Sequence, residues 1–248
     1  GQAFERLLAD PNLKIAIAAK LMHPEVKVVC RADSHEVEAN MASFGTDFIY
    51  DPFDIFGAYL AMAIATSCLT LMRDWLSGLQ GEPLKDPHMP PAEGLWLLCG
   101  YGRFGKAIAA NLGARGMDLV LVEAAPELTG RPEGIPLVLG WGTETHTLEQ
   151  AGVRRAVGLV VGTHNDANNL SIIMTARNLN TDLLIVVWEN HKDNGELFRA
   201  VGANIVMHPS TIIADRIRIL LVTPLLTEFE QLVRLQDHAW SCELVSRI

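Results

Sequence analysis

Three glycines within six residues set the strongest condition on the fold of this chain. They stand in Gly100-Tyr101-Gly102-Arg103-Phe104-Gly105, directly after the apolar run Leu95 to Cys99 and at the start of a helical pattern from about Gly105 to Arg115. Glycines at these spacings permit a tight strand-to-helix turn, close approach of the backbone to a phosphate, and close packing of helix on strand. The helix start also offers backbone N–H groups to an anion. The pattern predicts a phosphate-binding turn, although a tight turn that has lost its ligand is the alternative.

The segments after this turn complete an α/β pattern. Short apolar runs follow at Asp118 to Val122 and Leu137 to Leu139, and Glu123 stands 18 residues after Gly105, at the end of the second strand. Further strands, at Val26 to Cys30 and Leu183 to Val187, are apolar without polar alternation, as in parallel sheets that are covered on both faces. We therefore predict a Rossmann-type fold with a doubly wound parallel sheet.

The chain also contains an internal repeat. Asn12-Leu13 and Asn169-Leu170 superpose with a constant offset of 157 residues, without a gap, over about fifty residues. Each copy predicts a helix (about Pro11 to Met22; Ala167 to Leu179), a strand, a second helix ending at a glycine, a short strand and a long helix. The identical pairs include Ile15/Ile172, Ala19/Ala176, Val29/Val186, Gly45/Gly202, Pro52/Pro209 and Ile55/Ile212.

Only the second copy is preceded by the glycine turn and its strands, so the first copy is half a domain. We assign residues 1–78 to this half-domain, 79–94 to a Pro- and Gly-containing linker, 95–220 to the complete Rossmann domain and 221–248 to a helix (Leu220 to Gln236) and a possible strand (Trp240 to Val245). A half sheet exposes an unpaired edge, which upstream residues or a neighbouring chain would cover. Because the chain begins without methionine, we expect it to start within a longer gene product.

Composition narrows the choice of partners. The formal net charge is −9 without a Lys/Arg cluster, which argues against nucleic acid. The four cysteines, Cys30, Cys68, Cys99 and Cys242, lie far apart and form no CxxC pair, so we expect reduced thiols in a cytosolic setting. The stretch from Ile55 to Met72 carries no charge over 18 residues. Its Ala, Gly, Ser and Thr content favours a buried or subunit-interface helix, with a membrane span as the alternative.

Two charged residues are candidates for nucleotide contacts. Glu123 would accept hydrogen bonds from ribose hydroxyls and repel a 2′-phosphate, which favours NAD or simple adenine nucleotides over NADP. Arg103 could donate two hydrogen bonds to a phosphate. The alternatives are an exposed strand-end acid for Glu123 and a solvated turn residue for Arg103.

A second wall of the site is predicted at the end of the fourth strand. There Thr163-His164-Asn165-Asp166 reaches the carboxyl edge of the sheet, where open α/β sheets bind ligands. Asp166 could instead cap the following helix. The eight histidines form no zinc-binding pattern, and we predict neither a metal site nor catalytic residues.

These motifs resemble the RCK domains, also called KTN or TrkA-N domains, that regulate potassium channels and transporters. In the second copy the resemblance rests on Cys99 to Gly105, Leu148 to Val153, Asn165 to Leu170, Ala176-Arg177 and Gly202 to Val206. In the first copy it rests on Asn12-Leu13, Ala19-Lys20, Phe44 to Ile49 and Asp51-Pro52.

The resemblance implies a cytosolic ligand-sensing module at the cytoplasmic face of the membrane. It would bind NAD(H), ATP, ADP or AMP, attach to a potassium pore or transporter subunit outside this chain, and pair through Ile55–Met72 and about Ile212–Leu221. The implied ligand contacts, with the wall above, are Gly100, Gly102, Arg103, Phe104, Gly105, Glu123, Thr163, His164 and Asp166. Two features depart from the family: Gly140-Trp141 replaces a usual Gly-Asp, and the first copy lacks a glycine loop.

Three functions remain open at this point. The leading one is a regulatory, non-enzymatic module in which nucleotide binding biases the orientation of two packed domains. An NAD-dependent oxidoreductase fragment would need an acid or base near the nicotinamide, and we identify none. An assembly domain with an empty pocket would bind no nucleotide.

Overall fold

The core of the molecule is a six-stranded parallel sheet. The computed structural model describes residues 10–32, 34–78, 90–91, 93–233 and 238–247. The strand order is β5-β4-β3-β6-β7-β8, which is the doubly wound arrangement that we predicted. The strands are β3 (Leu95–Cys99), β4 (Asp118–Glu123), β5 (Leu137–Leu139), β6 (Ala156–Val161), β7 (Leu184–Trp188) and β8 (Ile205–Met207).

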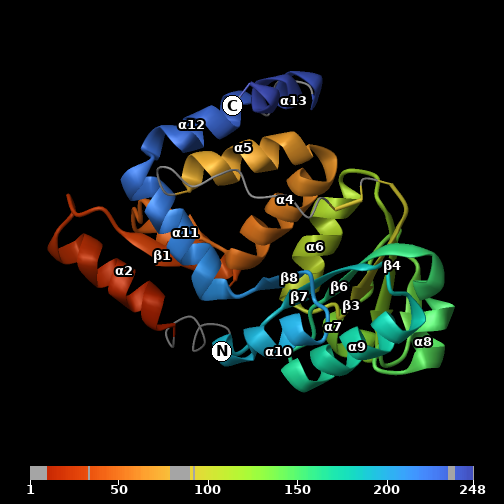
Figure 1. Cartoon of the computed structure of the whole chain (residues 1–248). Helices are drawn as coiled ribbons and strands as arrows, with labels where there is room; N and C mark the ends of the chain where they lie inside the picture. The colour runs from red at the N-terminus through yellow and green to blue at the C-terminus, as the bar shows by residue number, and fades with distance from the viewer. Residues whose placement is uncertain (1–9, 33, 79–89, 92, 234–237, 248) are drawn as a thin grey trace.

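Helices cover both faces of this sheet (Figure 1). Leu95, Leu97 and Cys99 of β3 face one hydrophobic cluster, whereas Trp96 and Leu98 face another. Helices α8 (Thr145–Gln150), α9 (Asp166–Leu179) and α10 (Gly195–Ala200) pack in the first cluster. Helix α6 (Arg103–Gly113) packs in the second, together with α4 (Pro52–Ala65) from the first copy. This two-sided cover explains why the central strands β3, β6 and β7 carry no charged side chain.

The first copy forms a smaller α/β unit. It comprises α2 (Pro11–Met22), β1 (Val29–Arg31), α3 (His35–Ser43) and β2 (Phe48–Tyr50), and it continues into α4. Strands β1 and β2 pair in parallel in a two-stranded sheet of their own. Buried residues of α2 and α3, among them Leu13 and Met41, form its core.

The two copies share individual hydrogen bonds as well as a fold. The Lys20 ammonium donates to the carbonyl oxygens of Pro24 and Val26, and Arg177, 157 positions later, donates to the equivalent carbonyls of Thr181 and Leu183. Two further hydrogen bonds repeat. The side-chain amide of Asn12 donates to Arg31 O, as that of Asn169 donates to Trp188 O. Val28 N donates to the Asp47 side chain, as Ile185 N donates to the Asn204 side chain. The repeat therefore preserves the polar contacts that hold each helix to its strand.

The long apolar stretch is not one helix. The prediction of a continuous helix from Ile55 to Met72 is wrong, because α4 ends at Ala65 and α5 (Ser67–Ser77) begins after Thr66. Thr66 has a φ of −143°, and both its N–H and its hydroxyl donate to Met62 O. Thr223 makes the same break between α11 (Pro209–Val222) and α12 (Pro224–Val233). Among the described residues, no helix has the length and hydropathy of a membrane span.

The C-terminal segment is helical. The prediction of a strand at Trp240 to Val245 is wrong, because this segment lies in the helix α13 (His238–Ser246), which packs along α5 and partly buries Leu244 and Val245 beside Leu69 and Met72. Apolar residues at neighbouring positions suited a strand as well as a helix, and the helical neighbour decides between them.

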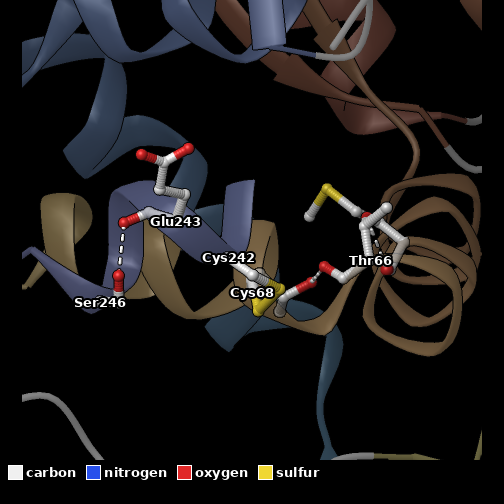
Figure 2. Close-up of a disulfide and its surroundings, with 7 residues drawn as sticks. Thr66, Cys68, Cys242, Glu243 and Ser246 are labelled. Carbon is white, nitrogen blue, oxygen red and sulfur yellow. Dashed lines mark hydrogen bonds between the residues drawn. A yellow bond between two sulfur atoms is a disulfide. The ribbon is translucent and has the colours of Figure 1, made fainter. Parts of the chain in front are cut away.

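A disulfide fastens this helix. Cys68 of α5 is bonded to Cys242 of α13, as Figure 2 shows, with Thr66 nearby at the helix break. The expectation of reduced thiols was wrong for this pair, since 174 residues separate the two cysteines and spacing gave no hint of their proximity. The remaining two, Cys30 and Cys99, are free thiols.

Three short elements complete the fold. The helix α7 (Pro126–Thr129) and the 3-10 turn η1 (Val153–Arg155) lie between β4 and β6, and a second 3-10 turn, η2 (Lys192–Asn194), precedes α10. A hollow of about 450 Å³ lies between α6 and residues 132–136. Tyr101 and Lys106 line it, so it adjoins the glycine turn from the outer side of α6 without being part of the crevice between β3 and β6.

Candidate nucleotide-binding site

Two of the three glycines are required by the fold itself. Gly100 has a φ of +96°, and a Cβ there would lie 2.9 Å from the carbonyl oxygen of Gly162. A Cβ on Gly105 would lie 2.1 Å from the carbonyl oxygen of Gly100. A side chain at either position would force the end of β3 away from α6 or β6. These two glycines therefore account for the tight turn and for the close packing of helix on strand.

Gly102 has no such structural requirement. Its φ is −67°, and a Cβ built there would meet no atom within 4 Å. It is the N-cap residue of α6, which has no side-chain cap. Its carbonyl accepts from Lys106 N, the first hydrogen bond of the helix. Glycine at this exposed position leaves the uncapped N–H groups of the first turn open to an approaching group.

Glu123 closes the other side of the turn. Its carboxylate accepts from Tyr101 N at 2.7 Å with one oxygen and from Ala125 N at 2.9 Å with the other. The acid therefore ties the glycine turn to the end of β4 while it stays partly exposed. Burial, reinforced by this negative charge, raises the pKa of the nearby Cys99 thiol to about 12. Cys99 is thus a protonated core residue at neutral pH.

The end of β6 forms the facing wall. Thr163 donates its N–H to the Asn169 side-chain oxygen at 3.1 Å and its hydroxyl to the same atom at 2.6 Å. The amide of Asn169, which is fully buried, donates to Trp188 O at 3.2 Å. His164 lies exposed beside Thr163. Asn169, which sequence reasoning did not select, fixes the position of this wall, and the sequence signal for it was the asparagine repeated at Asn12.

Phe104 lies beneath the turn. It is 3% exposed, and a Cβ on Gly162 would come within 2.1 Å of its ring. Its ring centroid is 4.8 Å from that of Trp188. Phe104, which was among the predicted ligand contacts, therefore lies in the core and supports the turn by packing against Gly162 and Trp188.

Asp166 organises the loop after β7. Its carboxylate accepts from Asn190 N, Asn190 Nδ2, His191 N and Asn194 Nδ2, all within 3.0 Å. Burial raises its pKa, but these hydrogen bonds outweigh that effect, and the pKa of Asp166 lies below its usual value. The helix cap is Asn165, which accepts from Ala167 N and Asn168 N, so the alternative that Asp166 caps α9 was wrong.

Arg103 reaches into the first copy. Its guanidinium donates to the Asp51 carboxylate at 3.0 Å and lies over the Phe53 ring at 4.6 Å from the centroid. Asp51 is the N-cap of α4, where it accepts from Phe53 N at 2.8 Å. Arg103 is therefore an exposed turn residue, with 43% of its side chain accessible, that also has a defined acidic partner. The sequence separation of 52 between the partners explains why sequence spacing did not connect them.

Comparison with known proteins identifies the second copy. Residues 96–209, which lie in the second copy, match the TrkA-N domain family. Over 139 residues the chain is 25% identical to "Probable potassium channel protein 2" of Methanocaldococcus jannaschii, a match that covers 54% of this chain and 40% of that protein. The chain therefore spans less than half of the length of this relative.

Solved structures show the same fold over most of the chain. The crystal structure of GsuK bound to ADP has a TM-score of 0.62 at 21% identity, covering 86% of this chain and 49% of that one. The GsuK channel bound to NAD has a TM-score of 0.63 at 18% identity, with coverages of 88% and 50%. At these identities the likeness shows a shared fold and nothing further.

Proposed function

We propose that this chain is the nucleotide-sensing regulatory part of a potassium channel or potassium transport system. The observation that carries the proposal is Gly102, because neither its backbone conformation nor its packing requires a glycine. A phosphate that approaches the start of α6 does require one. The similarity to a potassium channel protein and to structures that hold ADP or NAD supports the same function.

The residues of the site fit an adenine nucleotide. The uncapped N–H groups at the start of α6 would hold the phosphates, and the exposed part of the Glu123 carboxylate would accept from the ribose hydroxyls. Thr163, His164 and Asp166 would form the facing wall, with Asp166 acting through the loop that it organises. The negative charge of Glu123 disfavours a 2′-phosphate and so disfavours NADP.

Helix α6 offers a direct route from the ligand to the first copy. It begins at the glycine turn, and its far side packs on α4, where the backbone of Gly57 lies against Ala107 and Asn111. A ligand that shifts the start of α6 would therefore change its packing on α4. A differential binding energy of about 1–3 kcal/mol is enough for such coupling.

Pairing between subunits is proposed for the apolar face of α11 and α12. Ile64 of α4 is 4% exposed against α6, whereas its equivalent in the second copy, Leu221, is 74% exposed. Val222 and Leu225 are also exposed there. We expect another copy, or further parts of the same protein, to cover this face as α6 covers α4, at the cytoplasmic side of a membrane that holds the potassium pore.

Thermal unfolding with NAD, NADH, NADP, ATP, ADP and AMP tests the nucleotide site. The native chain should melt at a higher temperature with its nucleotide, and Gly102→Asp and Glu123→Ala should abolish the shift by repelling phosphate and by removing the ribose acceptor. Gly113→Asp is the matched control, because Gly113 is an exposed glycine of the same helix with open space around it. It should retain the nucleotide shift. If no nucleotide shifts the native chain, the assembly-domain function replaces this proposal.

A further inference from the structure

The arginine of the glycine turn is engaged by an acid from the other copy. Arg103, whose side chain is 43% exposed, donates to Asp51, whose side chain is 13% exposed. One Asp51 oxygen holds Arg103 while the other caps α4 through Phe53 N. Since the cap fixes the carboxylate, the guanidinium is the partner that is free to move. A phosphate at the glycine turn would approach the same guanidinium.

The surroundings of the turn are not strongly cationic. Besides Arg103, Lys106 lies near the turn, with its ammonium 5.6 Å from the centre of the Tyr101 ring. Opposite them stand Glu123, Asp51 and Asp54. Burial and the negative charge of Asp51 both raise the pKa of Asp54, which indicates a region where further negative charge is disfavoured.

The internal repeat shows that helix capping does not require this acid. The equivalent position in the second copy is His208, whose Nδ1 accepts from Ser210 N and caps α11. Both helices have 14 residues and begin with a proline. The cap of α4 therefore does not require the negative charge of Asp51, and this charge forms an ion pair with Arg103.

We propose that Asp51 competes with the ligand's phosphates for Arg103 and thereby makes the site prefer a dinucleotide such as NAD over ATP. This inference rests on the proposed nucleotide-binding function. A triphosphate carries more negative charge than the pyrophosphate of a dinucleotide, so it needs Arg103 more and suffers more repulsion from Asp51. When a ligand does draw Arg103 away, the contact that joins the start of α6 to the start of α4 is lost. Asp51 is thus a positioning residue that links ligand choice to the contact between the copies.

The test measures the dissociation constants of NAD and ATP by isothermal titration calorimetry. Asp51→Asn keeps an oxygen for the α4 cap and removes the charge. We expect it to tighten ATP binding by about five- to tenfold and NAD binding by about twofold or less. The gain should shrink as salt is added, because the effect is electrostatic. A merely structural role for Asp51 would change neither the ATP-to-NAD ratio nor its salt dependence.

Two further variants complete the design. Asp54→Asn removes a neighbouring charge that acts on Arg103 through space without forming an ion pair with it, so it should change the ATP-to-NAD ratio less than Asp51→Asn does, by about twofold or less. In an Arg103→Gln background, Asp51→Asn should no longer change that ratio, because the contested group is gone. An unchanged ratio in Asp51→Asn, with NAD still bound, overturns the inference alone. Failure of the native chain and all variants to bind either nucleotide overturns the proposed function and this inference together.

Discussion

At the residue scale, single polar side chains position the ends of the strands. Asp166 receives four hydrogen bonds and holds the loop after β7 beside the end of β6. The sequence placed Asp166 at the correct edge of the sheet, because the end of an apolar strand is readable. Its partners Asn190 and Asn194 were not predicted, since a loop carries no periodicity from which its path can be inferred.

Asp166 gives the fold a defined dependence on acid. Its pKa is lower in the folded chain than in the unfolded chain, so the stability that it contributes is fully present above the unfolded value of about 4 and is lost as pH falls through the folded value. Asp166→Ala should destabilise the chain at pH 7 by about 1–3 kcal/mol, because buried donors lose their acceptor. Urea unfolding at pH 7 and below pH 4 measures this. The loss should be smaller at the lower pH, and an equal loss at both would contradict an ionised native carboxylate.

At the element scale, the sequence predicts a helix or strand correctly where residues close in the sequence determine it. It fails where a contact with a segment far away in the sequence determines it. Leu95–Cys99, Leu137–Leu139 and Pro11–Met22 have the predicted bounds, because local apolar patterns and the N-terminal Asp10 and proline signals define them. The breaks at Thr66 and Thr223 were missed, since threonine in an apolar run is compatible with a continuous helix. The helical form of α13 depends on α5, which lies far away in sequence.

The contact between α4 and α6 depends on one glycine. A Cβ on Gly57 would lie 2.8 Å from Asn111 Nδ2 and 3.0 Å from Ala107 O, so Gly57→Ala forces the helices apart despite the better helix propensity of alanine. We expect a destabilisation of about 1–3 kcal/mol in chemical unfolding. Gly113→Ala, with open space around the added methyl group, is the control and should be neutral or stabilising. Equal effects of the two variants would show that the helices are not closely packed at Gly57.

At the scale of the whole molecule, the two copies are joined in ways that no single domain would show. Helix α4 of the first copy is part of the second copy's core, and its counterpart α11 packs on α4. The Arg103–Asp51 pair links the same two parts at the glycine turn. Leu221 and Val222 of α11 remain exposed, unlike Ile64 of α4. A sequence repeat predicts two similar units but not which helix of one covers the sheet of the other.

The disulfide adds a covalent link to this arrangement. The bond between Cys68 and Cys242 joins α13 to α5, and the two cysteines have a sequence separation of 174. A crosslink over a long loop restricts the unfolded chain, and the typical stabilisation is about 2–4 kcal/mol. Without the bond, α13 is held by a small cluster that includes Leu69, Met72 and Leu244.

Reduction should therefore loosen α13 before it affects the central sheet. A dithiol such as dithiothreitol, which supplies two electrons and two protons, should lower the melting temperature and increase hydrogen exchange in residues 238–247, while β3 and β6 keep their protection. Cys242→Ser should show the same exchange without reductant and no further response to it. Cys30→Ser, which removes a free thiol, is the control and should leave the response to reductant intact. If mass spectrometry of the unreduced chain finds four free thiols, α13 is held by packing alone, and reductant should change neither its exchange nor the melting temperature.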